Sequence, residues 1–215
     1  MLDVQTLARR IRTRLHDTDE IEYEDDQILD CINNGIRFIR RTIANIRPTL
    51  LMSEHKGTLA GGAKSVELPV RPLKIINVTL GTGGEFLHET EMATAIYENM
   101  YKMGDPKYFF LTGTKTINFY PVPSSNRQYT IRTVDDVNEV DWDGNSPLLT
   151  EFDDFLIEYA TIRLSVGNEY DMSQENQLMA NIVAQIQLIL TPPPSGILTR
   201  PYWDSGSGWS GGGYK

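Results

Sequence analysis

The feature that most constrains the fold is a run of isoleucines at helical spacing between residues 24 and 46. They recur every three or four positions, which places them along one face of a helix of 3.6 residues per turn. The acids before them suit the start of a helix, where free amide groups favour negative charge. Arg47-Pro48 ends the pattern. A helix over about 24–46 with an apolar stripe must pack against other helices or a sheet, and the stripe is Ile28, Ile32, Ile36, Ile39, Ile43 and Ile46.

Three further segments carry helical spacing and can provide that partner. They span about 3–15, 151–168 and 173–190, so helices open and close the chain. We therefore expect helices from the two ends to pack together as a bundle. The resulting fold class is α+β, with one domain over 1–190.

Between the helices, over about 57–134, the pattern changes to short strands separated by turn residues. "GTLAGGAKSVELPV" predicts two strands around Gly61-Gly62, and "LKIINVTLGTGGEFLHE" predicts a hairpin that turns at Gly83-Gly84. "EMATAIYENMYKM" predicts a short helix across this sheet. The insertion is expected to be a small antiparallel β domain.

"GDPKYFFLTGTKTINFYPVP", residues 104–123, has the composition of a phosphate loop but not its spacing. A phosphate loop needs G-x-x-x-x-G-K-[ST] between a strand and a helix, whereas Thr114 here separates Gly113 from Lys115 and a strand follows. The stretch instead predicts a β-hairpin that turns at Thr112 to Lys115.

Composition excludes several classes of protein. With a net charge of -9, the chain has no general excess of Lys and Arg for neutralising DNA phosphates. The single cysteine, Cys31, cannot form an internal disulfide, and we expect it to be a small core residue. Neither a signal peptide nor a membrane span is predicted.

Motifs for catalysis or metal binding are weak. "EVDWDGNSPLLT" places Glu139, Asp141 and Asp143 like the first ligands of a calcium loop, but Thr150 stands where the final glutamate belongs. A solvated acidic loop is the favoured interpretation. The three histidines lack metal-ligand spacing, and no serine sits in G-x-S-x-G. We expect no enzyme, no metal and no cofactor.

Two features need another explanation. Residues 134–158 contain nine acids and no Lys or Arg. The Gly-, Ser- and Pro-rich segment 191–215 cannot bury enough apolar surface to fold alone, yet it carries four aromatic residues at 202–214. Aromatic residues and arginine are the usual anchors of protein interfaces, so this segment is expected to be an extended arm that docks onto a partner.

The order of these parts resembles the head-to-tail adaptor proteins of tailed bacteriophages, the connectors that bind beneath the portal. The similarity rests on "LARRIRTRLHDT", "YEDDQILDCINNGIRFI", "LPVRPLKIINV", the 104–123 hairpin and "LLTEFDDFLIEYATIRL", and covers about residues 3–190. It implies a structural virion protein of the neck, assembled in the host cytoplasm. Its implied state is a dodecameric ring that joins the portal to a tail or nozzle protein and passes DNA without binding it.

The resemblance also implies roles for particular residues. C-terminal arms of such adaptors reach the portal or a neighbouring subunit, which makes candidate contacts of Arg200, Tyr202, Trp203, Trp209 and Tyr214. Acids that line a DNA channel repel phosphate. Candidates for that lining are Asp135, Asp136, Glu139, Asp141 and Asp143.

Two other classes remain open at the level of sequence. One is a monomeric β-rich module that recognises carbohydrate or peptide through aromatic residues. The other is a hydrolase with an unrecognised site. A ring adaptor would assemble alone or on the portal, whereas a monomeric module would be indifferent to it.

Overall fold

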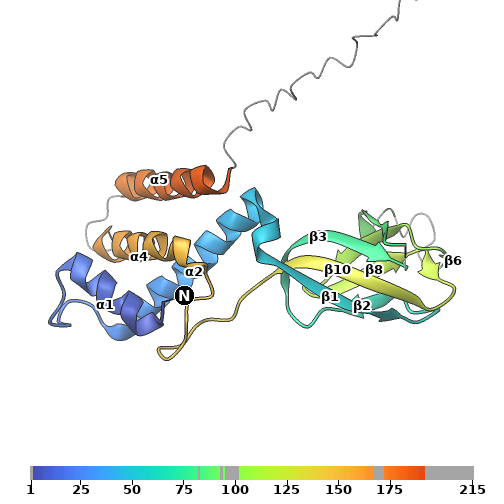
Figure 1. Ribbon diagram of the computed structural model, residues 1–215, viewed down its shortest axis with the longest axis horizontal. Helices are drawn as coiled ribbons and strands as arrows, with labels where there is room; N and C mark the ends of the chain where they lie inside the picture. Colours follow the sequence, from blue (N-terminus) through green and yellow to red (C-terminus); the bar gives the residue numbers. More distant parts are fainter. Residues whose placement is uncertain (1, 82, 93, 95–101, 167–171, 192–215) are drawn as a thin grey trace, which may run out of the picture.

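The computed structural model describes residues 2–81, 83–92, 94, 102–166 and 172–191, which form an elongated molecule with two parts (Figure 1). Helices occupy one end of the long axis and β-sheets occupy the other. The described helices are α1 (Val4–Leu15), α2 (Asp25–Ile46), α4 (Asp153–Val166) and α5 (Met172–Leu190), with short 3-10 turns η1 (Pro48–Leu51) and η2 (Thr150–Phe152). The predicted α+β class and the four long helices are confirmed.

The helical part is built around the isoleucine stripe of α2. Five of its six isoleucines are buried, and Ile46 packs at the edge of the same core. Helix α4 contacts α1, α2 and α5, so helices from the two ends of the chain lie against one another. Burial of these side chains is the main source of stability for helices of this length.

Local capping sets where the first two helices begin. The Asp3 carboxylate accepts a hydrogen bond from the Thr6 amide at 2.7 Å. At the start of α2, the Glu24 amide donates to the side chain of Gln27 at 3.2 Å. The acids predicted to begin the second helix are therefore divided, with Glu24 at the cap and Asp25 and Asp26 in the first turn.

The β part contains two four-stranded sheets and a small two-stranded one. The first sheet has the order β1-β10-β3-β4 and is antiparallel throughout. Its strands are β1 (Met52–Leu59), β10 (Arg127–Asp135), β3 (Pro72–Leu80) and β4 (Glu85–Phe86). The second has the order β2-β8-β7-β5, from β2 (Ser65–Glu67), β8 (Thr116–Tyr120), β7 (Tyr108–Thr112) and β5 (His88–Glu89). The third pairs β6 (Met103–Gly104) with β9 (Val122–Pro123).

Two expectations about this part are corrected. The β structure begins at Met52 rather than near 57. The predicted strands around Gly61-Gly62 are present as β1 and β2, and they pair with β10 and β8. The domain is also not wholly antiparallel, because β5–β7 and β6–β9 are parallel pairs. The short helix expected over 91–103 lies outside the described residues except at its ends, and Met103 belongs to β6.

The two predicted hairpins are confirmed. Strands β3 and β4 pair across the turn at 81–84. In the other hairpin, β7 and β8 pair with Tyr108 opposite Tyr120 and Thr112 opposite Thr116. Gly113 has a φ of 61°, the left-handed conformation that glycine adopts without cost. Residues 104–123 therefore form no phosphate loop.

The helical and β parts are joined by two chain segments. Helix α2 runs through η1 into β1, and β10 returns the chain to the helices (Figure 1). The junction is reinforced by Arg40, whose Nη2 donates to the Asp135 carbonyl at 3.0 Å, and by Lys74, whose Nζ donates to the Ala44 carbonyl at 3.3 Å. These contacts fasten α2 to the first sheet.

Candidate functional site

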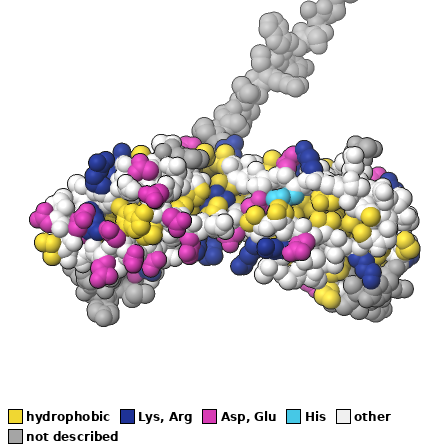
Figure 2. Space-filling model, turned by 90° about the horizontal axis from the view of Figure 1, so that it is seen from below, with side chains coloured by type: hydrophobic (Ala, Val, Ile, Leu, Met, Phe, Trp, Pro, Cys, Tyr) yellow, Lys and Arg dark blue, Asp and Glu magenta, His cyan; other side chains and the backbone are white. Residues whose placement is uncertain are grey.

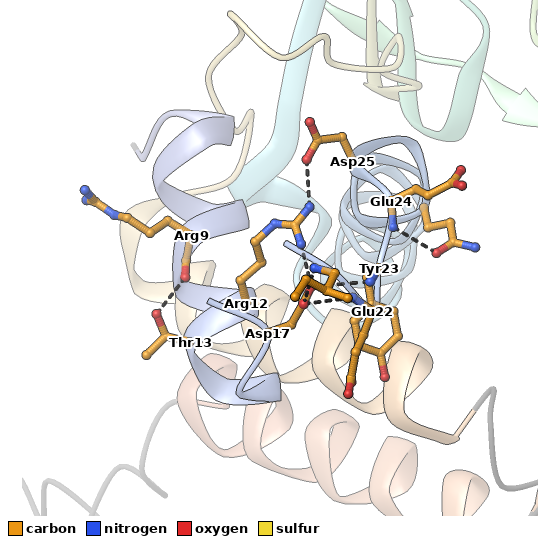
Figure 3. Close-up of polar contacts among 10 residues, drawn as sticks. Arg9, Arg12, Thr13, Asp17, Glu22, Tyr23, Glu24 and Asp25 are labelled. Atoms are coloured by element: carbon orange, nitrogen blue, oxygen red, sulfur yellow. Dashed lines mark hydrogen bonds and ion pairs between the residues drawn. The ribbon is translucent and has the colours of Figure 1, made fainter. Parts of the chain in front are cut away.

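A cluster of hydrogen-bonded and ion-paired side chains lies at the connection between α1 and α2 (Figure 3). Arg12 is buried and its two terminal nitrogens bind different acids, Asp17 at 2.5 Å and Asp25 at 2.7 Å. Asp17 also accepts hydrogen bonds from three backbone amides of the connecting loop, those of Ile21, Glu22 and Tyr23. One carboxylate thus shapes the whole loop.

These contacts also lower the pKa of Asp17. The Glu22 amide, with those of Ile21 and Tyr23 and the charge of Arg12, holds the pKa of Asp17 below its usual value. Two residues of the loop, His16 and Glu20, have left-handed backbones with φ of 59°. Because Asp17 pairs with buried Arg12 and accepts hydrogen bonds from the loop backbone, this cluster is a structural joint between α1 and α2.

An open groove of about 670 Å³ lies against this joint. It runs between α1, the α1–α2 loop and the loop that carries Trp142. Arg12 forms part of its wall together with Asp25, and the other lining residues are Gln5, Ala8, Arg9, Thr13, Thr18, Glu20 and Trp142. In Figure 2, hydrophobic side chains on the helical part are surrounded by acidic and basic ones.

The acidic segment that follows β10 is fixed onto α2. The side chain of Asn33, which is buried on α2, donates to the Val140 carbonyl at 3.1 Å and accepts from the Val140 amide at 2.8 Å. Arg37, one turn further along α2, forms an ion pair with Glu139. Sequence reasoning missed Asn33, because an asparagine in a helix gives no indication of a partner 107 positions away.

The structure separates the five acids predicted to line a channel into two groups. Asp135 and Asp136 are half-buried, whereas Glu139, Asp141 and Asp143 are exposed. Asp135 lies 3.1 Å from Nε2 of His55 and also accepts from Thr133. Burial raises the pKa of Asp135, but hydrogen bonds from Thr133 and His55 outweigh it and hold that pKa below its usual value.

Among the exposed acids, Glu139 is the partner of Arg37, and Asp143 accepts a hydrogen bond from Gln5 at 3.2 Å. The Asp141 carbonyl accepts from the Gly144 amide at 2.9 Å, which closes a turn at the position suggested for a calcium loop. Within the part of the chain that the structure describes, His, Cys, Asp and Glu form no group of three or more that could hold a metal. The acidic segment is held against α2 as an ordered strap.

Other sequence candidates are placed as follows. Cys31 is half-buried beside the helical core, and burial raises the pKa of its thiol. Lys115 donates from Nζ to the Pro69 carbonyl at 3.5 Å from the hairpin turn. The proposed arm contacts, from Arg200 to Tyr214, lie outside the described residues. None of the helices within the described ranges is long and apolar enough to cross a membrane.

The described residues form a four-helix part joined to a part built of β-sheets, with an acidic strap held on α2. This combination agrees with the α+β class expected from the sequence. In a comparison with protein families, the family model described as SU10 adaptor protein matches residues 2–193. The chain belongs to this family of phage head-to-tail adaptors. No curated protein matches the chain.

Proposed function

We propose that this protein forms a dodecameric ring that joins the portal to a tail or nozzle protein and extends the channel for DNA. The family match over residues 2–193 carries the proposal. Membership of an adaptor family implies a structural connector role, a place in the virion neck, and association with portal and tail proteins. The ring, its copy number, the channel and assembly in the host cytoplasm are the proposed refinements.

The shape of the subunit supports this role. The helical and β parts lie at opposite ends of a long axis, so one subunit has separate surfaces for two partners (Figure 1). The parts are connected by α2 and by hydrogen bonds at Arg40 and Lys74, which suits a component that transmits force between portal and tail. We infer that the arm over 191–215 adds a further contact with the portal through its aromatic residues.

The exposed acids of the strap support the channel. Glu139, Asp141 and Asp143 lie close together in the chain and face solvent, and carboxylates at a channel wall repel DNA phosphates. Asp135 and Asp136 are half-buried, and Asp135 is engaged by His55 and Thr133. We therefore propose that the lining role falls chiefly on the three exposed acids.

The decisive experiment measures the mass of the purified protein alone and mixed with purified portal, and images both samples by negative-stain microscopy. A ring, formed alone or only on the portal, is the expected result. A monomer indifferent to portal would exclude the connector and leave the monomeric β-rich module as the better explanation.

A further inference from the structure

The outer face of α5 has an unusual composition for a surface. Residues 176–190, "NQLMANIVAQIQLIL", contain no Asp, Glu, Lys or Arg, although charged residues make up 23% of the chain. Ile182, Ile186 and Leu190 of this helix are buried against the core. The exposed positions are Asn176, Gln177, Ala180, Asn181, Ala184, Gln185, Gln187, Leu188 and Ile189.

This face ends in the most prominent apolar side chains of the helix. Leu188 is 78% exposed and Ile189 is 48% exposed. Ala180, Ala184 and Leu188 are spaced four residues apart, which forms a ridge with little side-chain bulk along about 12 Å of helix. Exposed helix faces normally carry charge, whereas interface centres are depleted of it, so this ridge has the composition of an interface.

A second surface in the same helical part is concave. It is the groove of about 670 Å³ between α1 and the Trp142 loop, with Ala8 and Trp142 among its lining residues. Helices α2 and α4 both contact α1 and α5, and α1 and α5 lie on opposite sides of them (Figure 1). One side of the helical part is therefore a ridge and the other side is a groove.

A ring of identical subunits requires such a pair. In a head-to-tail contact, one surface of a subunit meets a different surface of the next, and repetition of that contact closes a ring when the rotation allows it. We propose that the uncharged face of α5, centred on Ala184 and Leu188, docks into the α1–Trp142 groove of a second copy of this chain. This inference rests on the proposed ring and identifies the subunit contact within it.

The charges of the groove fit an uncharged helix as the occupant. Arg12 in the wall is already ion-paired with Asp17 and Asp25, so a helix that covers it need not supply a carboxylate. Arg9 and Glu20 carry opposite charges among the lining residues. Amide, alanine and leucine side chains add no further charge to this lining.

The same chemistry argues against DNA as the occupant of the α5 face. DNA binding relies on Lys and Arg that neutralise phosphates, and a channel wall that repels DNA relies on carboxylates. Residues 176–190 supply neither. A protein surface is the partner that this composition fits.

Photo-crosslinking tests the contact directly. A benzophenone maleimide is attached to the L188C variant in a C31S background, so that the probe has one site. Nitrogen-15-labelled and unlabelled subunits are mixed, assembled with portal and irradiated, and crosslinked peptides are identified by mass spectrometry. We expect peptides from 5–25 or around Trp142, with heavy–light pairs that prove contact between copies.

Other crosslinks would overturn the inference: pairs within one copy only, to residues 192–215, to portal only, or none in assembled rings. Ring formation is scored by microscopy in the same samples. Rings without the expected crosslink reject the docking site and retain the connector, whereas absence of rings with every variant and with the unmodified protein rejects the connector itself.

Substitutions provide a second measurement. L188E places a carboxylate in the contact and should weaken association between copies about tenfold or more, whereas the uncharged L188Q should weaken it less. F86E makes the matched change at an exposed apolar residue of β4, in the other part of the molecule, and should leave association unchanged. Equal association of L188E and the unmodified protein, with both folded by circular dichroism, contradicts the proposal.

Discussion

At the scale of single residues, a small number of polar side chains determine how chain segments meet. The carboxylate of Asp17 accepts hydrogen bonds from three backbone amides and from the guanidinium of Arg12. Asn33 uses both ends of its amide group to pair with the backbone of Val140. Each replaces hydrogen bonds to water at a buried position, where an unpaired group would be costly.

The depressed pKa of Asp17 predicts a dependence of stability on pH. A carboxyl whose folded pKa lies below its unfolded value of about 3.9 stabilises the fold above that pH, and the contribution is lost as pH falls through the folded pKa. D17N should therefore lower the urea midpoint at pH 7, and the difference from the unmodified protein should shrink below pH 4.

The control for this prediction is D19N, at an exposed acid of the same loop. It should behave like the unmodified protein across the same pH range. A D17N deficit that stays constant from pH 7 to pH 2.5 would contradict the assigned role of the carboxylate.

Loss of the Asn33 amide should release the acidic strap. N33A leaves the amide and carbonyl of Val140 without their partner, at a cost of about 1–3 kcal/mol. Hydrogen exchange measured by NMR should show Val140 exchanging roughly tenfold faster or more. N34A, at the exposed neighbouring position, is the matched control and should leave Val140 protected.

At the scale of elements, the packing of α2 against α4 depends on a glycine. A Cβ on Gly35 of α2 would lie 2.5 Å from Cδ1 of Leu156 and 2.9 Å from Cδ1 of Tyr159, both on α4. These side chains are themselves buried, so neither can move aside freely. Gly35 is what allows α2 and α4 to pack at this distance.

G35A should therefore destabilise the protein despite the better helix propensity of alanine. Overpacking costs about 1–3 kcal/mol, against about 1 kcal/mol gained from propensity, so a net loss of up to about 2 kcal/mol is expected. Urea unfolding followed by circular dichroism measures it. N34A again serves as the control, and a G35A protein as stable as N34A would show that α4 repacks without cost.

At the scale of the whole molecule, two long parts joined through α2 and β10 suit a component that lies between two partners (Figure 1). The family match covers the helical part, the β part and the start of the C-terminal segment.

Deletion of the C-terminal arm, residues 191–215, should weaken binding to portal at least about tenfold. The deletion removes the proposed anchors, which are Arg200, Tyr202, Trp203, Trp209 and Tyr214. Surface plasmon resonance with immobilised portal measures the affinity. W203A/W209A should reproduce most of the loss and S205A/S207A should not; unchanged affinity after deletion would exclude the arm as an anchor.

The channel prediction concerns the exposed acids of the strap. The triple variant E139Q/D141N/D143N should slow genome packaging or ejection, because a wall with fewer carboxylates repels phosphate less and lets the DNA contact it. Time-resolved DNA release from virions measures ejection. The matched variant E67Q/E85Q/E89Q neutralises three exposed acids of the β part, and equal rates for both variants and the unmodified virion would remove the lining role.

The sequence by itself determined the helices, the class and the family. The isoleucine stripe, the capping acids and the β7–β8 hairpin are local patterns, since periodicity and turn residues act within a few positions. The C-terminal arm and the channel acids stay predictions, because the former lies outside the described residues and the latter depends on how copies assemble.

Only the tertiary structure decided which distant segments pair. The partnership of β1 with β10, the parallel pairs, the Asn33–Val140 contact and the close approach at Gly35 join residues far apart in the chain. Such contacts depend on burial and hydrogen bonding across the whole fold, and they cannot be predicted from the preferences of neighbouring residues in the chain. For the same reason, the ridge on α5 and the groove beside Trp142 could be recognised as opposite surfaces only once the helices were assembled.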